Sequence, residues 1–458
     1  MLWNWTRRIL AGVLTAGVLW APALAAEPET PAQTPSPWAY GALADSYAMG
    51  LVDDNYPSYI QDPLTQEQLE AMTAVAAGKL ALLELPQRPA DTAGLVVDTT
   101  RGGVMNALYQ EAAAYELEGI EAGAEAFLTG LGVVQGDQNG DLRLADPCTY
   151  QEAMVMTERL ILAVYDANDA GSKGLLWKAV NGDNTLYLLG TIHLDRSNAY
   201  PLHKSVRDAL DEAQVVSFEL DLNDQEGLAQ LVSRQSYSDG TTLADHISPE
   251  LYQRVQAAAE SMGVGPHDLD GFKAWALAST FGTLSLQDDT TSANMMAIDM
   301  YINAYAVNAG KTIDAVETYD LQLDIFDGLS PEYQEAYLDS SLALYEAALS
   351  GQEVSEDAQA MAQAQEAQIA AMFDARKDRD PETFAAVYGK ETVMDSGDEL
   401  NVKLFTERDP GMIAAAAEYL ETEGENTFFL AVGAGHMVDP GGIVSGLRDL
   451  GYTVELVP

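Results

Sequence analysis

The chain has 458 residues, with 71 Asp and Glu against 23 Lys and Arg, which gives a formal net charge of −48. A chain of this length can form roughly two or three domains, each with its own core. Its acidity excludes nucleic acids and acidic lipids as partners, because these need clustered Lys and Arg to displace counterions. Cys148 is the only cysteine, so no intramolecular disulfide can form, and we interpret its thiol as incidental rather than catalytic.

The first 25 residues predict a cleaved export signal. Arg7 and Arg8 precede the apolar run 9–20, and small residues at Ala23-Leu24-Ala25 form the expected cleavage site. The run is shorter than the roughly 20 residues needed to cross a bilayer, and no later segment is apolar for long enough. We therefore expect a mature chain that lies outside the cytoplasm, either secreted or attached to the cell surface, and that does not span a membrane.

The next part of the chain predicts a linker and a helical domain. Residues 26–37 are rich in Pro, Thr and Glu, which is typical of a linker, and residues 38–170 predict a mainly α-helical domain. Segments 38–82 and 119–167 share the order helix, glycine turn, polar loop and second helix. The domain therefore contains two related units.

The second helix of each unit starts after a threonine, Thr65 or Thr149, whose hydroxyl can accept from the free N–H groups of the first turn. The pattern over residues 36–168 resembles degenerate S-layer homology repeats. That resemblance implies a bacterial surface protein whose N-terminal domain binds a cell-wall polymer. The Thr-Arg pair common in such repeats is replaced here by Thr65-Gln66 and Thr149-Tyr150.

Residues 171–458 predict strands that alternate with helices. Apolar runs flank Asn181-Gly182-Asp183-Asn184, which predicts a hairpin turn. The expected strands are 175–180, 185–189, 215–222, 312–316, 427–432 and 453–457. The expected helices are 202–213, 249–262, 272–281, 292–308, 331–349, 355–376 and 443–450. The fold class is therefore α/β, a mixed sheet covered on both faces and carrying a helical insertion.

Two of the five histidines share a sequence context. Gly190-Thr191-Ile192-His193 and Gly433-Ala434-Gly435-His436 each follow an apolar strand. Glycine lets the backbone leave the strand sharply with positive φ, or lets another group approach closely. Ligands of open α/β sheets bind at the carboxyl ends of the strands. We favour a joint site over two unrelated structural histidines.

The strand at 215–222 brings carboxylates towards the same edge. Alternation places Glu219 and Asp221 on one face, so the pattern does not choose between them. Two imidazoles and one carboxylate leave a divalent metal with open positions for water and substrate. Among the other histidines, His203 is expected to cap or flank a helix, and His246 and His267 lie in loops.

The region from Leu175 onwards resembles the TraB/GumN family, which is related to the Tiki Wnt-cleaving proteases and more distantly to erythromycin-esterase-like and ChaN-like proteins. The matching pieces are Gly190-Thr191-Ile192-His193-Leu194, Tyr200-Pro201-Leu202, Phe218-Glu219-Leu220-Asp221, Lys273-Ala274-Trp275, Glu317-Thr318 with Gln322, Glu407-Arg408-Asp409 and Val432-Gly433-Ala434-Gly435-His436-Met437-Val438. Asp409 stands where the family usually has Asn.

The resemblance implies that His193 and His436 are metal ligands or catalytic groups and that Glu219 is a ligand or the general base. It also implies peptide hydrolysis that depends on manganese or cobalt, with zinc as a further candidate. In such hydrolysis the metal activates a water and polarises the carbonyl, and a carboxylate takes the proton. Arg408 is the candidate to stabilise the oxyanion. Glu317 is either a second base or a residue that holds a helix start.

The expected function is therefore an exported metal-dependent hydrolase, a peptidase first of all, with a peptide or a small molecule as substrate. Two alternatives stay open. The same edge can bind a small ligand or haem in a surface protein without catalysis, or it can support ester hydrolysis. Glu219 cannot be both an inner metal ligand and the general base, so one of its two roles is wrong.

Overall fold

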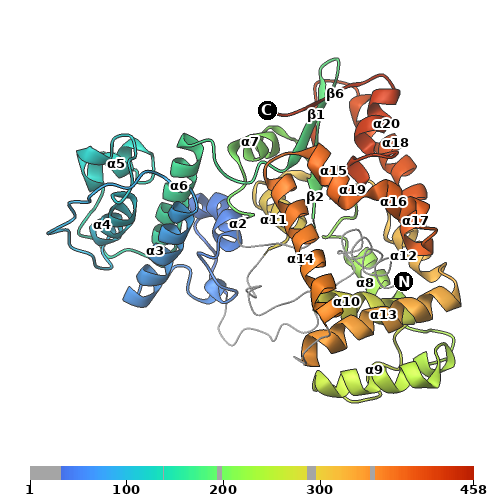
Figure 1. Cartoon of the computed structure of the whole chain (residues 1–458). Coiled ribbons are helices and arrows are strands. Elements are labelled where there is room, and N and C mark those ends of the chain that lie inside the picture. Colours follow the sequence, from blue (N-terminus) through green and yellow to red (C-terminus); the bar gives the residue numbers. More distant parts are fainter. Residues whose placement is uncertain (1–31, 138, 193–198, 286–295, 351–355) are drawn as a thin grey trace.

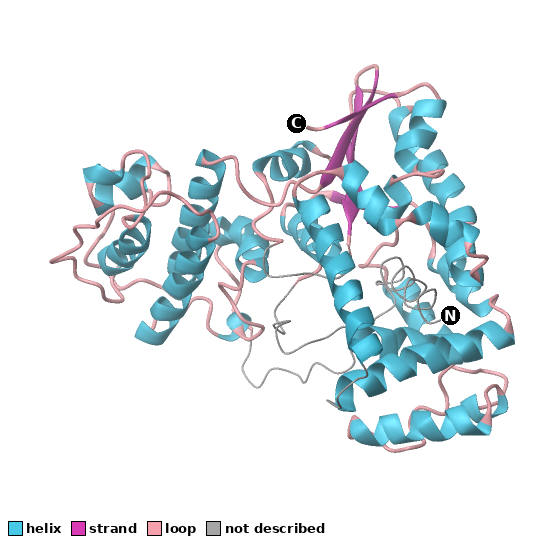
Figure 2. Ribbon diagram, viewed as in Figure 1, coloured by secondary structure: helices cyan, strands magenta, loops and turns pink. Residues whose placement is uncertain are grey.

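The structure is a computed structural model that describes residues 32–137, 139–192, 199–285, 296–350 and 356–458 (Figure 1). Its described strands form one mixed sheet in the order β4-β3-β5-β2-β1-β6 (Figure 2). They are β1 (Leu175–Asn181), β2 (Asn184–Thr191), β3 (Val215–Phe218), β4 (Thr312–Ala315), β5 (Thr427–Gly433) and β6 (Thr453–Leu456). The predicted α/β class with a mixed sheet is confirmed. The predicted export signal lies outside the described residues.

β1 and β2 form the predicted hairpin. Asn181 pairs with Asn184, and Gly182 between them has a φ of +58°, which residues with a Cβ avoid. β1 also pairs antiparallel with β6, whereas β2, β5, β3 and β4 are parallel neighbours. β5 thus lies between two strands that precede it by a long stretch of chain. The carboxyl ends of four parallel strands meet at one edge of the sheet.

Helices cover both faces of the sheet, as its short apolar strands predicted. Leu189 and Ala431 belong to a core that includes α7 (Lys204–Glu212), α11 (Ile298–Asn308) and the N-terminal helices. Their sequence neighbours Leu188 and Leu430 belong to a second core, with residues of α18 (Asp409–Leu420) and α20 (Ile443–Asp449). The alternation follows from the period of two in a strand.

The N-terminal region is helical and lies beside the part that contains the sheet (Figure 1). Its elements are η2 (Pro37–Ala39), α2 (Tyr40–Ala48), η3 (Tyr56–Ser58), α3 (Gln66–Ala81), α4 (Arg101–Ala112), η4 (Ile120–Ala122), α5 (Ala124–Gly130) and α6 (Tyr150–Ala167). α3 and α6 begin directly after Thr65 and Thr149, as predicted. α4 begins in the same way after Thr100, whose hydroxyl accepts from Gly103 N–H. The repeat pattern did not predict this third capped helix.

Two runs of helices interrupt the strand order. Between β3 and β4 lie α8 (Gln225–Arg234), η5 (Leu243–Asp245), α9 (Pro249–Ser261), α10 (Ala274–Ser285) and α11. Between β4 and β5 lie α12 (Tyr319–Asp327), α13 (Pro331–Ser350), α14 (Glu356–Lys377), α15 (Pro381–Tyr388), α16 (Lys390–Asp395), α17 (Glu399–Thr406) and α18. Trp275, Phe281 and Phe326 belong to a separate core within these helices. In Figure 1, α9, α10 and α13 lie at the opposite end of the molecule from β6.

Several predicted boundaries differ from the structure. α7 begins at Lys204 rather than at residue 202, because the His203 side chain caps it. β3 ends at Phe218 rather than at residue 222. α11 begins at Ile298, and the first residues of the predicted helix, 292–295, lie outside the described residues. In the described ranges, no helix combines the length and the apolar character that a membrane crossing requires.

Candidate active site

Glu219 and the second Gly-x-x-His turn meet at the carboxyl edge of the sheet. β3 and β5 are parallel neighbours, with Phe218 opposite Ala431. Glu219, the first residue after β3, is buried, and its Oε1 accepts a hydrogen bond of 2.8 Å from Gly433 N–H. The short helix α19 (Ala434–Met437) follows at once and carries His436. Strand pairing therefore brings together two motifs that are far apart in the sequence.

The prediction that Glu219 and Asp221 share one face is wrong, because β3 ends before either residue. Asp221 lies in a turn, where its Oδ1 accepts from Asn223 N–H at 2.8 Å. It is half-exposed, whereas Glu219 is buried. The sequence pattern did not choose between Glu219 and Asp221. In the structure, Glu219 is the one that bonds to the second turn.

Close packing explains the glycines of the two turns. A Cβ on Gly190 would lie 3.1 Å from the Cα of Ala434, so the first turn packs directly against the second. A Cβ on Gly435 would lie 2.7 Å from the Tyr388 hydroxyl. Neither glycine has a positive φ, so close approach is the reason for glycine at both positions. His193, which follows the first turn, lies outside the described residues.

One arginine holds two buried carboxylates at this edge. Nε of Arg408 donates to Glu317 at 2.9 Å, and its Nη2 donates to Glu317 at 2.7 Å and to Glu219 at 2.6 Å. Gln322 on α12 donates to Glu317 at 2.9 Å. Burial lowers the pKa of Arg408, but Glu219 and Glu317 outweigh burial and raise this pKa above its ordinary value. The guanidinium therefore stays charged and fixes both carboxylates by charge-assisted hydrogen bonds.

His436 is fully buried and held by a second ionic pair. Its Nδ1 lies 2.6 Å from Oδ1 of Asp409. Oδ2 of Asp409 accepts from Lys390 Nζ at 2.8 Å, and the same Nζ donates to the Val438 carbonyl at 3.0 Å. Burial lowers the pKa of Lys390, and Asp409 opposes that shift. A carboxylate beside Nδ1 favours the imidazole form that carries its proton there and leaves Nε2 as a free acceptor.

Three buried polar atoms at this edge have no hydrogen-bond partner in the described part of the chain. They are Nε2 of His436, the hydroxyl of Tyr388 and the hydroxyl of Thr191, which ends β2 opposite Gly433. Burial raises the pKa of Tyr388 and Asp409 raises it further, so the phenol keeps its proton. Because buried polar atoms are paired in the large majority of cases, these atoms mark the edge as a candidate place for a ligand.

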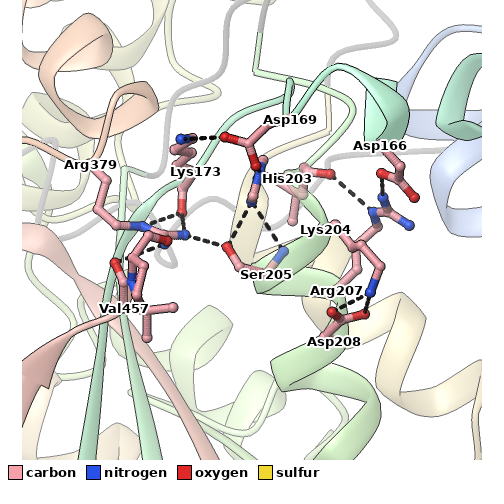
Figure 3. A network of polar contacts seen from close by, with 12 residues as sticks. Asp166, Asp169, Lys173, His203, Lys204, Ser205, Arg207, Asp208, Arg379 and Val457 are labelled. Atoms are coloured by element: carbon pink, nitrogen blue, oxygen red, sulfur yellow. Dashed lines mark hydrogen bonds and ion pairs between the residues drawn. The ribbon is translucent and has the colours of Figure 1, made fainter. Parts of the chain in front are cut away.

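The other described histidines lie away from this edge. His203 caps α7, as predicted, and its Nε2 lies 3.0 Å from Asp169. Figure 3 shows the surrounding network, in which Arg379 donates to the backbone carbonyls of Gly174 and Val457. His246 and His267 are exposed. These contacts are structural.

Cys148 is also remote from the candidate site. Its side chain is buried in the N-terminal core. Burial raises the pKa of the thiol to about 12, so almost no thiolate forms at neutral pH. This environment agrees with the prediction that the cysteine is incidental and not catalytic.

The described side chains offer part of a metal site. Within the described ranges, no three His, Cys, Asp or Glu side chains form a group that could hold a metal ion. The bare Nε2 of His436 and the fixed carboxylate of Glu219 nevertheless suit a cation. Among the described residues, the carboxylates of the cluster outnumber its cations by three (Glu219, Glu317, Asp409) to two (Arg408, Lys390). A bound cation would compensate the buried negative charge that remains.

Three residues of this edge were not predicted from the sequence. Asp409 was noted only as a departure from the family pattern, yet it binds His436. Lys390 and Tyr388 lie on short helices of the insertion and have no motif spacing to His436. The adjacency of Asp409 to the candidate residue Arg408 was the one available signal.

The fold and this edge define an α/β protein with a histidine and carboxylate site at the ends of parallel strands. Residues 175–456 match the model of the TraB/PrgY/gumN family, so the chain belongs to that family. The predicted family is confirmed. The match begins at Leu175, so the S-layer homology of residues 36–168 stays a prediction.

Two curated relatives are similar to part of the chain. Metalloprotease TIKI2 of Danio rerio is 24% identical over an alignment of 302 residues that covers 59% of this chain and 58% of the relative. Metalloprotease TIKI1 of Danio rerio is 23% identical over an alignment of 311 residues that covers 62% of this chain and 63% of the relative. The chain thus spans about three fifths of the length of these relatives. No solved structure matches it.

Proposed function

We propose that this chain is a metal-dependent hydrolase that cleaves peptide bonds outside the cytoplasm. The observation that carries the proposal is the bare, buried Nε2 of His436, whose Nδ1 is held by Asp409. Histidines that bind metals commonly present one nitrogen to the ion and donate the other N–H to a carboxylate. The names of the two similar metalloproteases support the same reading.

We assign His436 and Glu219 as metal ligands, with His193 as the further ligand proposed from its Gly-x-x-His motif. When bound, a divalent cation (manganese or cobalt first, zinc next) would lower the pKa of a water and polarise the scissile carbonyl. Both oxygens of Glu219 already accept from fixed donors, Gly433 N–H and Arg408. Such a carboxylate is suited to a ligand position and poorly suited to swing towards a water as a base.

We assign Arg408 and Glu317 a supporting role. Nε and Nη2 of Arg408 donate to carboxylates, so these N–H groups hold Glu219 in place and do not face a substrate. Glu317 secures the other side of the guanidinium and is itself fixed by Gln322. Nε and Nη2 are therefore not assigned the oxyanion role that was predicted for Arg408.

The test is metal analysis and hydrolysis with the wild-type chain, His193→Ala and His436→Ala, and with the exposed His246→Ala as the matched control. Purified protein is incubated with Mn²⁺ and assayed on a broad peptide library and on ester substrates side by side. We expect both site variants to lose bound metal and peptide hydrolysis, and His246→Ala to keep both. Unchanged metal content and hydrolysis in the two site variants would overturn the proposal, and cleavage of esters alone would make the chain an esterase.

The N-terminal helices carry a separate proposal, binding to a bacterial cell-wall polymer. Within residues 38–170 the Thr-Arg pair of such repeats occurs once, at Thr100-Arg101, where Arg101 is paired with Glu152 at 2.6 Å and donates to the Leu142 carbonyl. Retention of the full chain on purified cell-wall polymer is the measurement. If the full chain is not retained, the N-terminal helical domain is a spacer and not a polymer-binding domain.

A further inference from the structure

The hydroxyl of Tyr388 is a buried group that the assignments above leave unused. Tyr388 is the last residue of α15, and its hydroxyl has no hydrogen-bond partner in the described part of the chain. Its ring stacks on Phe384 and meets the ring of Phe405 edge-on, so the hydroxyl cannot turn to solvent without repacking the core. An unpaired buried hydroxyl is unfavourable, which indicates that it has a partner in another state of the molecule.

The hydroxyl lies against the turn that carries His436. The ideal Cβ position of Gly435 is only 2.7 Å from it, so the absence of a side chain at residue 435 makes room for the phenol. Phe405, which packs on Tyr388, also contacts the imidazole of His436, with ring centroids 5.4 Å apart. The Tyr388 hydroxyl and Nε2 of His436, both without a partner among the described residues, thus belong to groups that flank one turn at the carboxyl edge of the sheet.

Hydrolysis at this edge needs a donor for the carbonyl oxygen. Nε and Nη2 of Arg408, the candidate from the sequence, donate to Glu317 and Glu219. A phenol is a neutral donor with no acceptor to compete for its proton at this position. It adds no charge to the cluster, which lets it stabilise an oxygen only as that oxygen becomes negative.

We propose that Tyr388 is a catalytic hydrogen-bond donor to the substrate oxygen that becomes negatively charged, an inference that rests on the proposed function. Water adds to the carbonyl carbon, while the π pair of the C=O bond moves onto oxygen. The O–H of Tyr388 donates to that oxygen and keeps its proton. The pair then returns as the C–N bond breaks, and the amine leaves with the proton that the added water gives up.

The experiment compares Tyr388→Phe with the wild-type chain and with Tyr165→Phe, each loaded with Mn²⁺. The Tyr165 hydroxyl is also buried, but it donates to the Lys79 carbonyl at 2.8 Å on α3, in the N-terminal region. We expect Tyr388→Phe to lower kcat on peptides by about 10²-fold, the effect of removing one such donor, with KM and metal content unchanged. Its Tm should stay equal or rise, because no hydrogen bond is lost, whereas Tyr165→Phe should lower Tm and leave kcat unchanged.

Each outcome either supports or overturns the donor role of Tyr388. A wild-type chain that hydrolyses peptides and a Tyr388→Phe variant with the same kcat would overturn the inference and leave the proposed function standing. A Tyr388→Phe variant that loses Tm as Tyr165→Phe does, together with its metal, would show a structural hydroxyl and overturn it as well. A wild-type chain that neither binds metal nor hydrolyses peptides refutes the proposed function, and the donor role with it, from the wild-type measurement alone.

Discussion

Glu219 and Glu317 are buried at the sheet edge beside one arginine that bonds to both of them. Asp45 on α2 and Glu158 on α6 are buried as well, but in the described part of the chain neither forms an ion pair with an arginine. At this junction of α2 and α6 with α7 and α11, Tyr301 donates to Asp45 at 3.1 Å, and Arg207 acts on both carboxylates through space while its Nη2 pairs with Asp166. The two places contain the same kind of side chain in a similarly dry environment.

The electrostatic surroundings differ in the two places. Burial raises the pKa of Asp45 to about 6 and that of Glu158 to about 8; Asp166 and Asp211 also raise the pKa of Asp45, and Asp45 raises that of Glu158. At the edge, Arg408 stays protonated because Glu219 and Glu317 raise its pKa. A bidentate cation favours the charged form of the carboxylates that it binds, whatever their burial. The cluster that contains such a cation is the one at the proposed site.

The groups around the junction come from four helices. They are Asp45 on α2, Glu158, Arg159 and Asp166 on α6, Arg207 and Asp211 on α7, and Tyr301 and Tyr305 on α11. Acids outnumber basic groups among them, which is why burial is not offset there.

Removal of the edge arginine should have the largest effect. Arg408→Met leaves two buried carboxylates without their cation, so we expect a loss of about 3–5 kcal/mol in the free energy of unfolding, measured by urea denaturation. Arg254→Met is the control, since Arg254 also pairs with two carboxylates, Glu346 and Asp339, but is partly exposed. The control should change stability by less than about 1 kcal/mol. Equal losses in the two variants would remove the distinction between buried and exposed pairs.

The second ionic pair of the edge offers a double-mutant cycle. Asp409→Asn leaves the Lys390 ammonium buried without its carboxylate, and we expect a loss of roughly 2–4 kcal/mol. Adding Lys390→Met should restore most of that stability, because the unpaired charge is gone. Metal affinity should fall by about 10–100-fold in both variants, because the carboxylate that orients His436 is missing. Additive stability effects would show that the two side chains do not interact.

The junction should respond to pH in the opposite sense to an ordinary salt bridge. In the native state the pKa of Asp45 is raised from 3.8 to about 6 and that of Glu158 from 4.5 to about 8, so the native state holds more protons than the unfolded chain across this window. Stability should therefore fall as pH rises from about 4 to 8. Glu158→Gln mimics the protonated acid, so it should match the wild-type chain near pH 5 and exceed it by on the order of 2 kcal/mol at pH 8. Parallel stability curves for the two proteins would contradict the raised pKa.

The smallest effect is expected from the tyrosine at the junction. Tyr301→Phe removes the hydrogen bond to Asp45, at a cost of about 1 kcal/mol near neutral pH. The loss should be smaller near pH 4, where the carboxyl is protonated in any case. Thermal melts at both pH values measure the difference, and a loss that does not depend on pH would indicate packing alone.

Features encoded by neighbouring residues could be predicted from the sequence. The hairpin follows from Asn181-Gly182-Asp183-Asn184, the cap of α7 from His203, and the second site turn from the strand before Gly433. Each depends on residues a few positions apart, whose geometry the local chain largely determines. The α/β class followed from the same local periods.

Features that depend on distant pairing could not be predicted. Arg408 reaches Glu219 across 189 residues, and no spacing in the sequence indicates that contact. The end of β3 at Phe218 also depends on tertiary structure, because Glu219 leaves the strand path to accept from Gly433 N–H. Alternation along a continuous apolar run therefore overestimated the strand and wrongly paired Glu219 with Asp221. Lys390 and Tyr388 became site residues only through the packing of short helices.

The central position of β5 has a consequence for the order in which the molecule folds. The hydrogen bond from Gly433 N–H to Glu219 joins positions 214 residues apart. β2 and β3 do not pair with each other, so they belong to one sheet only after β5 has paired with both of them. Closing so long a loop costs entropy before any contact offsets it, and non-local pairing of this kind is slow. A partly folded chain accordingly has no assembled histidine and carboxylate pair. In the proposed hydrolase, the site and the sheet are completed in one event, so the chain cannot cleave peptides while its own backbone is still accessible.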